Sequence, residues 1–137
     1  MKILFLCTGN TCRSPLAEVY LRSKRPQWSI DSAGVAAVAG TPATEQARSV
    51  AAEAGLELGE HKARPLEEIS LEEYDKIYAM SSTHLRYLPE GHQGASLSTL
   101  DGQSKDVEDP YGRGLESYRE AFSEIRKYLD RLLEEEV

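Results

Sequence analysis

The sequence predicts an α/β fold in which a four-stranded parallel sheet is covered by helices on both faces. Two observations lead to this prediction. Short apolar runs alternate with longer segments of helical periodicity, and the first run, "KILFLC", is apolar after its first residue. Such runs are typical of parallel strands that are buried on both faces. The length of 137 residues suits one domain, 1–137.

Four segments are predicted to be strands because each is short, largely apolar and bounded by turn-forming residues. They are "KILFLC" at 2–7, "WSIDSAGV" at 28–35, "YDKIYAM" at 74–80 and "ASLSTL" at 95–100. Because helices separate the strands along the chain, we expect the strands to pair in parallel.

Helices are predicted where apolar residues recur three and four positions apart. They span 14–25, 41–58, 81–88 (a turn or two only) and 115–133. Ser14 is a candidate N-cap of the first helix, with Pro15 at its first helical position. The alanine-rich second helix should end near Gly55. The last helix has the clearest apolar stripe, which we expect to pack against the sheet.

Composition narrows the function classes. The net charge of −7 argues against binding to nucleic acid or to an anionic membrane surface. No apolar run is long enough to span a membrane, and the first ten residues turn polar too quickly for a signal peptide. We therefore expect a cytoplasmic monomer whose two cysteines are free thiols.

The segment "CTGNTCRS", residues 7–14, joins the first strand to the first helix. In open parallel sheets, ligands bind at this end of the strands, where helix N-termini present free N–H groups. Gly9 and Asn10 permit a turn that directs backbone N–H groups toward an anion. Arg13 adds a planar fork that matches two phosphate oxygens. The sequence therefore predicts a phosphate-binding loop between the first strand and the first helix.

Cys7 is the candidate nucleophile of this loop. A thiol beside a helix N-terminus and an arginine loses its proton readily, so we expect a thiolate that attacks the phosphorus of a bound phosphate. Ser14 is expected to donate a hydrogen bond to this sulfur and to ease its departure. A lone cysteine near the end of a strand is usually a small buried apolar residue. The glycine, asparagine, arginine and Ser-Pro that follow Cys7 favour the catalytic interpretation.

"CTGNTCRSP" resembles the signature of the low-molecular-weight protein tyrosine phosphatase family, in which a cysteine, five residues and an arginine form the phosphate loop. "DSAG" at 31–34, "HKAR" at 61–64, "YDKIYAM" and "EDPYG" at 108–112 follow in the family's order, so the resemblance covers the whole chain. It implies a protein phosphatase with the fold predicted above. It also implies that the phosphoryl group is held by Thr8, Gly9, Asn10, Thr11, Cys12 and Ser14.

The roles of Asp109 and Tyr111 rest on the resemblance. The chain has 23 Asp and Glu residues, and composition selects none of them. An Asp-Pro pair alone most often opens a turn. By resemblance, Asp109 is the general acid and Tyr111 walls the substrate cleft.

The implied mechanism has two steps. Cys7 attacks phosphorus while Arg13 holds the phosphoryl oxygens and Asp109 protonates the leaving atom. Asp109 then takes a proton from the water that hydrolyses the phosphocysteine and releases inorganic phosphate. Because Arg13 and backbone dipoles supply positive charge, the resemblance implies no metal and no cofactor.

Further polar residues resemble the family's hydrogen-bond network that supports the loop. They are Asn10, Ser14, Ser32 and His61. Considered alone, His61 would be a surface or capping histidine. His84 and His92 match no motif, and we expect both to be solvated. The cysteines and histidines also lack the spacing of a zinc site.

Cys12 lies inside the loop, and two roles remain open for it. It packs beneath the loop as a small apolar residue, or it forms a reversible disulfide with Cys7 that protects the reactive thiol from overoxidation.

The phosphorylated residue is not settled by the loop motif. Thr11 stands on the rim, where tyrosine-directed members more often carry a bulkier aliphatic residue, and "GNTCRSP" resembles the branch that acts on protein phosphoarginine. A threonine hydroxyl can hydrogen-bond to a guanidinium, which isoleucine cannot. The segment "AGVAAVAGTPAT" at 33–44 also offers no aromatic wall for a phenol ring. We expect phosphoarginine to be the substrate, with phosphotyrosine as the alternative.

Three other classes are less consistent with the sequence. An arsenate reductase would need an external thiol, because no cysteine follows Cys12. A phosphocysteine carrier domain has no reason for Arg13 or Asp109. A non-catalytic anion-binding module has no need of Cys7.

Overall fold

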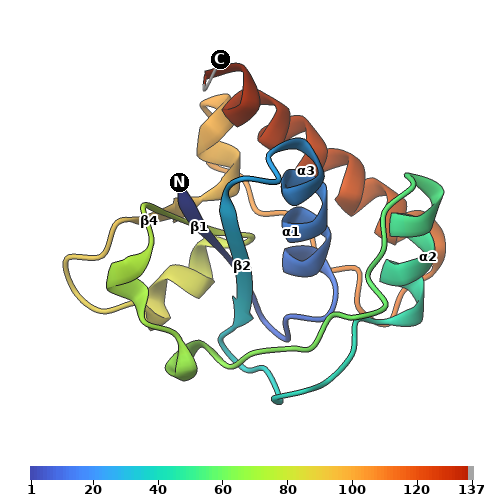
Figure 1. Cartoon of the computed structure of the whole chain (residues 1–137), viewed down its shortest axis with the longest axis horizontal. Helices are drawn as coiled ribbons and strands as arrows, with labels where there is room; N and C mark the ends of the chain where they lie inside the picture. Colours follow the sequence, from blue (N-terminus) through green and yellow to red (C-terminus); the bar gives the residue numbers. More distant parts are fainter. Residues whose placement is uncertain (136–137) are drawn as a thin grey trace.

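The computed structural model describes residues 1–135 and has the predicted α/β architecture (Figure 1). Four parallel strands form one sheet in the order β2-β1-β3-β4. The strands are β1 (Lys2–Cys7), β2 (Ser29–Gly34), β3 (Lys76–Ala79) and β4 (Gly94–Ser96). Residues 136–137 of the expected domain lie outside the described residues.

β1 is a central strand, and both of its faces are buried, as the uninterrupted apolar run predicted. Successive side chains of a strand point to opposite faces. Ile3 and Phe5 pack into a cluster with residues of two α-helices. Leu4 and Leu6 pack into a second cluster with residues of short 3₁₀ helices. The sheet therefore has helices on both faces, with the α-helices on one face and 3₁₀ segments such as Leu66–Glu68 on the other.

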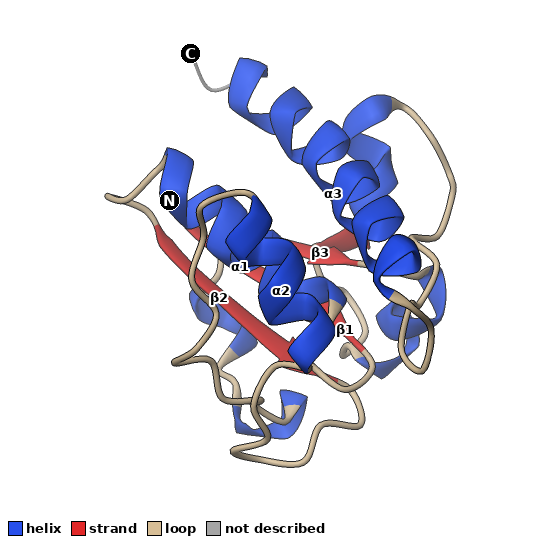
Figure 2. Cartoon of the chain, turned by 90° about the vertical axis from the view of Figure 1, so that its right-hand side faces the viewer, coloured by secondary structure: helices blue, strands red, loops and turns tan. Residues whose placement is uncertain are grey.

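The α-helices are α1 (Arg13–Lys24), α2 (Glu45–Glu53) and α3 (Leu115–Glu135). The 3₁₀ helices are η1 (Leu66–Glu68), η2 (Leu71–Glu73), η3 (Ser82–Tyr87) and η4 (Leu97–Asp101). Figure 2 shows the three α-helices together in front of the sheet. α2 packs against α1 and α3 through a separate apolar cluster.

The stripe of α3 is buried as predicted from Tyr118 onward, whereas Leu115, the first residue of the predicted stripe, is 38% exposed. The buried residues of α3 are Tyr118, Ala121, Phe122, Ile125, Tyr128, Leu129 and Leu132. The ring of Phe122 meets Tyr20 of α1 edge-on, with 6.1 Å between ring centroids. Truncating a buried aromatic ring of this kind to alanine costs about 3–5 kcal/mol of stability. The last helix thus holds α1, and with it the loop before α1, against the sheet.

Three local predictions are wrong. The helix predicted over 41–58 is shorter, because α2 begins at Glu45, after its N-cap Thr44, and ends at Glu53. Ser14 is not the N-cap of α1, because the helix already begins at Arg13 and the Ser14 hydroxyl contacts the Cys7 sulfur. The fourth strand ends at Ser96 rather than at residue 100. The chain then turns into η4, which places Leu97 in the core cluster shared with α3.

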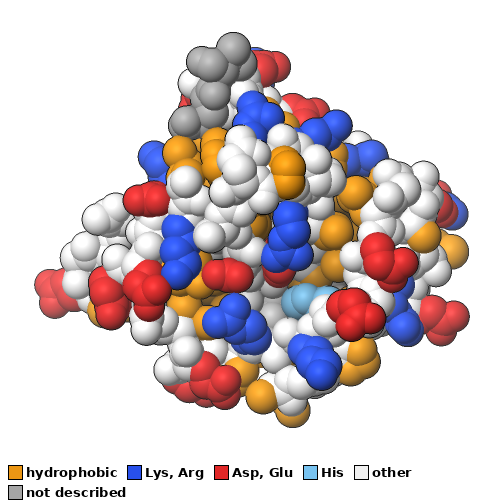
Figure 3. Space-filling view, viewed as in Figure 1, with side chains coloured by type: hydrophobic (Ala, Val, Ile, Leu, Met, Phe, Trp, Pro, Cys, Tyr) orange, Lys and Arg blue, Asp and Glu red, His pale blue; other side chains and the backbone are white. Residues whose placement is uncertain are grey.

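The face of the molecule in Figure 3 carries Lys and Arg side chains interspersed with Asp and Glu, without a broad area of one charge sign. Within residues 1–135, no helix combines the length and the apolar character needed to cross a membrane.

Candidate active site

The loop between β1 and α1 turns at Asn10, which has φ of 58°. Asn10 is the one non-glycine residue with positive φ in the described chain, and asparagine tolerates this conformation better than most residues. Its side-chain nitrogen donates to Ser14 Oγ at 2.7 Å and to Ser32 Oγ at 2.9 Å. Its side-chain oxygen accepts the backbone N–H of Arg64 at 2.9 Å. The buried amide therefore ties the loop to α1, to β2 and to the segment after α2.

His61 and Glu18 extend this network. The His61 ring donates through Nε2 to the carbonyl oxygen of Asn10 at 2.7 Å. Ser32 donates its proton to the Glu18 carboxylate, which leaves Ser32 Oγ free to accept from Asn10. The structure thus brings the four predicted support residues together. Glu18 was not predicted, because its place on the helix face toward Ser32 depends on how α1 packs on β2.

Gly34, at the end of β2, is a second support that sequence reasoning missed. A Cβ atom at this position would lie 2.6 Å from the Thr8 carbonyl oxygen and 2.9 Å from the Asn10 backbone nitrogen. The loop backbone therefore lies against the space that only glycine leaves open. "DSAG" was noticed as a motif, but this close approach exists only in the folded chain.

Cys7 lies at the floor of the loop and is 2 % exposed. Its sulfur accepts the backbone N–H of Asn10 at 3.2 Å and lies 2.9 Å from Ser14 Oγ. Because Ser14 Oγ already accepts from the Asn10 amide, the Ser14 hydroxyl can donate its own proton to the sulfur. Two donors therefore meet at the Cys7 sulfur.

Arg13, the first residue of α1, is buried beside the loop. Its Nη1 donates to Ser81 Oγ at 3.0 Å and to the Val107 carbonyl oxygen at 2.8 Å. Its Nη2 lies 3.4 Å from Thr8 Oγ1. Its Nε is buried and has no hydrogen-bond partner among the described residues. A buried N–H without a partner is costly, so this nitrogen is available to donate to a bound group.

A cavity of about 350 Å³ opens above the sulfur. The predicted residues that line it are Cys7, Thr8, Gly9, Thr11, Cys12, Arg13, Asp109 and Tyr111. Asp109 Oδ2 lies 3.6 Å from Arg13 Nη2, and Asp109 Oδ1 accepts the Tyr111 backbone N–H at 3.0 Å. The loop before α3 thus carries a half-exposed carboxylate to the mouth of the cavity. Tyr111 is 68 % exposed and stands at the rim.

Cys12 is buried under the loop and points toward α3. Its sulfur lies 3.3 Å from the Tyr118 hydroxyl and 3.8 Å from Thr44 Oγ1. Burial raises the pKa of the Cys12 thiol and raises that of Tyr118 to about 12. Both cysteines are free thiols. These contacts fit the packing role for Cys12, and the disulfide with Cys7 stays a prediction.

The prediction that His84 is solvated is wrong. His84 is 3 % exposed, and its Nε2 lies 3.0 Å from Thr8 Oγ1. Burial, together with the nearby charge of Arg13, lowers the His84 pKa to about 4. Ser81, which receives the Arg13 guanidinium, was not predicted either. The local sequence around Ser81 and His84 does not indicate a contact with the loop. The contact arises because β3, which precedes η3, pairs with β1, which precedes the loop.

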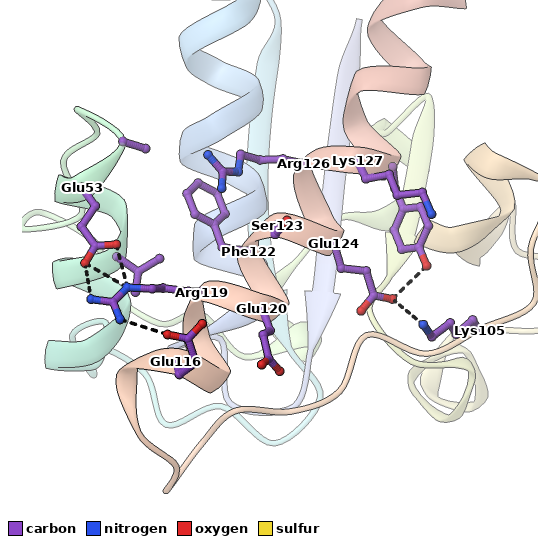
Figure 4. Close-up of a pocket in the computed structure, with 13 residues that line it drawn as sticks. Glu53, Lys105, Glu116, Arg119, Glu120, Phe122, Ser123, Glu124, Arg126 and Lys127 are labelled. Carbon is purple, nitrogen blue, oxygen red and sulfur yellow. Dashed lines mark hydrogen bonds and ion pairs between the residues drawn. The ribbon is translucent and has the colours of Figure 1, made fainter.

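A second hollow, about 740 Å³, lies between α2 and α3 (Figure 4). Several of its charged side chains pair with one another. Arg119 bridges Glu53 at 2.7 Å and Glu116 at 3.3 Å, and Lys105 lies 4.0 Å from Glu124. The hollow includes neither Cys7 nor Arg13, so its size does not make it the reactive site.

Known proteins share both the sequence pattern and this geometry. The family model described as "Low molecular weight phosphotyrosine protein phosphatase" matches residues 2–137. A protein-arginine-phosphatase of Geobacillus stearothermophilus is 36% identical over 140 residues, which covers 97% of this chain and 94% of that protein.

Solved structures agree closely. The low molecular weight protein tyrosine phosphatase from T. tengcongensis superposes with a TM-score of 0.91 at 37% identity, covering 98% of this chain and 99% of that chain. A YwlE arginine phosphatase mutant with a phosphorylated active-site serine superposes with a TM-score of 0.90 at 31% identity, covering 98% and 95%. The chain therefore belongs to the low molecular weight phosphotyrosine protein phosphatase family and is a protein phosphatase of that family.

Proposed function

We propose that the protein hydrolyses phosphorylated protein side chains through a phosphocysteine on Cys7, with phosphoarginine as the preferred substrate. The observation that carries the proposal is that Asp109, which lies far along the chain from the loop of Cys7 and Arg13, lines the same cavity as these two residues. A nucleophile, an anion-binding group and a proton donor are the three groups that metal-free phosphoryl transfer to a cysteine requires.

In the first step the Cys7 thiolate attacks phosphorus. The sulfur–phosphorus bond forms as the bond from phosphorus to the leaving nitrogen or oxygen breaks, and the leaving atom takes the proton of Asp109. The Arg13 guanidinium and the loop N–H groups hold the phosphoryl oxygens, where negative charge is concentrated. The unpartnered Nε of Arg13 gains its hydrogen bond in this complex.

In the second step water attacks the phosphocysteine. Asp109, now a carboxylate, accepts a proton from the water as the sulfur–phosphorus bond breaks and inorganic phosphate forms. Cys7 leaves as a thiolate, which accepts hydrogen bonds from the Ser14 hydroxyl and the Asn10 N–H. The YwlE mutant with a phosphorylated active-site serine supports a covalent phosphoryl intermediate on a residue of this loop in the family.

Thr11 supports phosphoarginine as the substrate. It lines the cavity, and its carbonyl oxygen accepts the Thr44 N–H at 3.0 Å, which holds the rim in place. A guanidinium has only N–H donors and needs acceptors, and the Thr11 hydroxyl supplies one. The lining from the segment after β2 contains no aromatic residue and includes the small residues Ala36 and Pro42. The 36% identical protein-arginine-phosphatase adds support.

Phosphotyrosine is the second candidate. Tyr111 at the rim can stack on a phenol ring, and the relative from T. tengcongensis is named a protein tyrosine phosphatase.

The deciding experiment compares kcat/KM for a phosphoarginine and a phosphotyrosine peptide, on the wild type and on Thr11→Ile. We expect the wild type to prefer the phosphoarginine peptide. Thr11→Ile should lower kcat/KM for phosphoarginine about tenfold, because one acceptor for the guanidinium is lost. The variant should therefore prefer phosphotyrosine. Thr99→Ile, at an exposed threonine outside the cavity, is the matched control.

Preference for phosphotyrosine in both enzymes would make the protein a tyrosine phosphatase. Hydrolysis of neither peptide, with Cys7 still trapping phosphate covalently, would contradict the phosphatase proposal and favour a carrier.

A further inference from the structure

His84 is the buried titratable side chain that the steps above do not use. It belongs to η3, on a different segment from every residue assigned so far to the reaction. Its Nδ1 accepts the backbone N–H of Ser81 at 3.1 Å, and its Nε2 lies 3.0 Å from Thr8 Oγ1. Thr8 lines the cavity directly after Cys7.

The hydrogen bonds determine the protonation of the ring. Because Nδ1 accepts an N–H, it carries no proton, so the single proton of the neutral ring is on Nε2 and is donated to Thr8. The lowered pKa agrees with a neutral ring: burial and Arg13 disfavour the charged form, and Asp106 and Asp109 oppose them only in part.

Thr8 and Ser81 are also the two hydroxyls that receive the Arg13 fork. Arg13 Nη1 donates to Ser81 Oγ at 3.0 Å, and Nη2 donates to Thr8 Oγ1 at 3.4 Å. Ser81 Oγ also accepts the backbone N–H of His84. Each hydroxyl oxygen therefore accepts one hydrogen bond from Arg13 and one from His84.

This pairing leaves one direction for the Thr8 proton. A hydroxyl has two acceptor positions and one donor, and both acceptor positions of Thr8 are filled. Its proton therefore points away from Arg13 and His84, and Thr8 faces the cavity.

We propose that His84 is a positioning residue: it holds the two hydroxyls that orient the Arg13 fork, and it turns the Thr8 hydroxyl into a donor toward the bound phosphoryl group. The proposal rests on the proposed function, since it adds a donor to the same phosphoryl site. His84 itself does not touch the substrate.

A purely structural role must be separated from this one, because His84 also caps η3. His84→Asn keeps an oxygen where Nδ1 accepts the Ser81 N–H, but its side chain is too short to reach Thr8. His84→Gln restores an N–H donor near the position of Nε2. His92→Asn is the matched control, since exposed His92 also accepts a backbone N–H through Nδ1, from Gly94 at 2.9 Å.

The experiment measures three quantities on each variant: kcat and KM for p-nitrophenyl phosphate, the Kd of inorganic phosphate by calorimetry, and Tm. For His84→Asn we expect about tenfold weaker phosphate binding and a lower kcat/KM, in line with the loss of one hydrogen bond. His84→Gln should recover most of both, and His92→Asn should match the wild type. Thr8→Val should reproduce His84→Asn, and the double variant should be no worse than Thr8→Val alone.

Unchanged phosphate binding and unchanged kcat/KM in His84→Asn would overturn the inference. Additive losses in the double variant would overturn it as well, because His84 would then act independently of Thr8. If His84→Asn lowers Tm, Thr8→Val decides, since it leaves the η3 cap intact. Failure of the wild type to bind phosphate or to cleave the ester would instead refute the proposed function.

Discussion

Replacing Gly34 by alanine tests whether the loop backbone must lie where it does. Gly34 has no positive φ, so alanine meets no dihedral strain, and the effect is one of space. The new Cβ would lie 2.6 Å from the Thr8 carbonyl oxygen, whereas a close C···O contact is about 3.3 Å. The Thr8 carbonyl must therefore move by about 0.7 Å.

That movement is expected to lower both the stability of the protein and the rate of the reaction. The Thr8 carbonyl accepts the Ala36 N–H at 2.9 Å, and this bond stretches when the loop moves. Overpacking costs about 1–3 kcal/mol of stability, which corresponds to a Tm lower by about 3–10 °C for a chain of this size. A displacement of about 1 Å at a reacting group can lower the rate a hundredfold, so we expect kcat to fall by about 10- to 100-fold.

The assay is hydrolysis of p-nitrophenyl phosphate, with Tm measured on the same samples. Gly114→Ala is the control, because a Cβ there meets no atom within 4 Å and the glycine has no positive φ. A Gly34→Ala enzyme whose kcat stays within about twofold of the wild type would refute the steric reasoning. So small a change means that the activation free energy of the reaction is nearly the same in both enzymes, and hence that the site is undisturbed.

Two further predictions concern protons. Asp109→Asn should lower kcat by about 10²–10⁴-fold for a peptide whose leaving group needs a proton, and far less for p-nitrophenyl phosphate; equal losses on both would contradict the role of general acid. The pKa of His84 is lowered to about 4 from 6.5, so the folded state resists protonation of this ring and is destabilised at low pH. The free energy of unfolding is unaffected by protonation of His84 above pH 6.5 and decreases as the pH falls toward 4, by up to about 3 kcal/mol. Urea unfolding between pH 7 and pH 4 should show a smaller loss in His84→Gln; parallel curves for both proteins would contradict this.

Local patterns were sufficient for the elements that carry their own signal. The apolar run of β1 and the stripe of α3 from Tyr118 onward are buried as predicted, because periodicity and burial are properties of neighbouring residues. Predicted ends were less accurate: β4 stops at Ser96 because packing of Leu97 in the core outweighs strand propensity. Cys7 and Arg13 could be predicted as site residues for the same local reason, since one loop holds both.

Asp109 marks the limit of residue-by-residue reasoning. Composition offered 23 carboxylates, and only the resemblance to a family selected this one. The folded chain supplies the physical reason, because the loop before α3 brings Asp109 within 3.6 Å of Arg13.

By itself, the sequence determined the α/β class, the phosphate loop and its likeness to a phosphatase family. Only the tertiary structure decided that His84 is buried against Thr8, that Ser81 receives Arg13, and that Gly34 makes room for the loop. These three residues follow β3 or end β2, and they reach the loop because both strands pair with β1. Contacts between residues far apart in the chain depend on strand order and register, which no local stretch of sequence encodes.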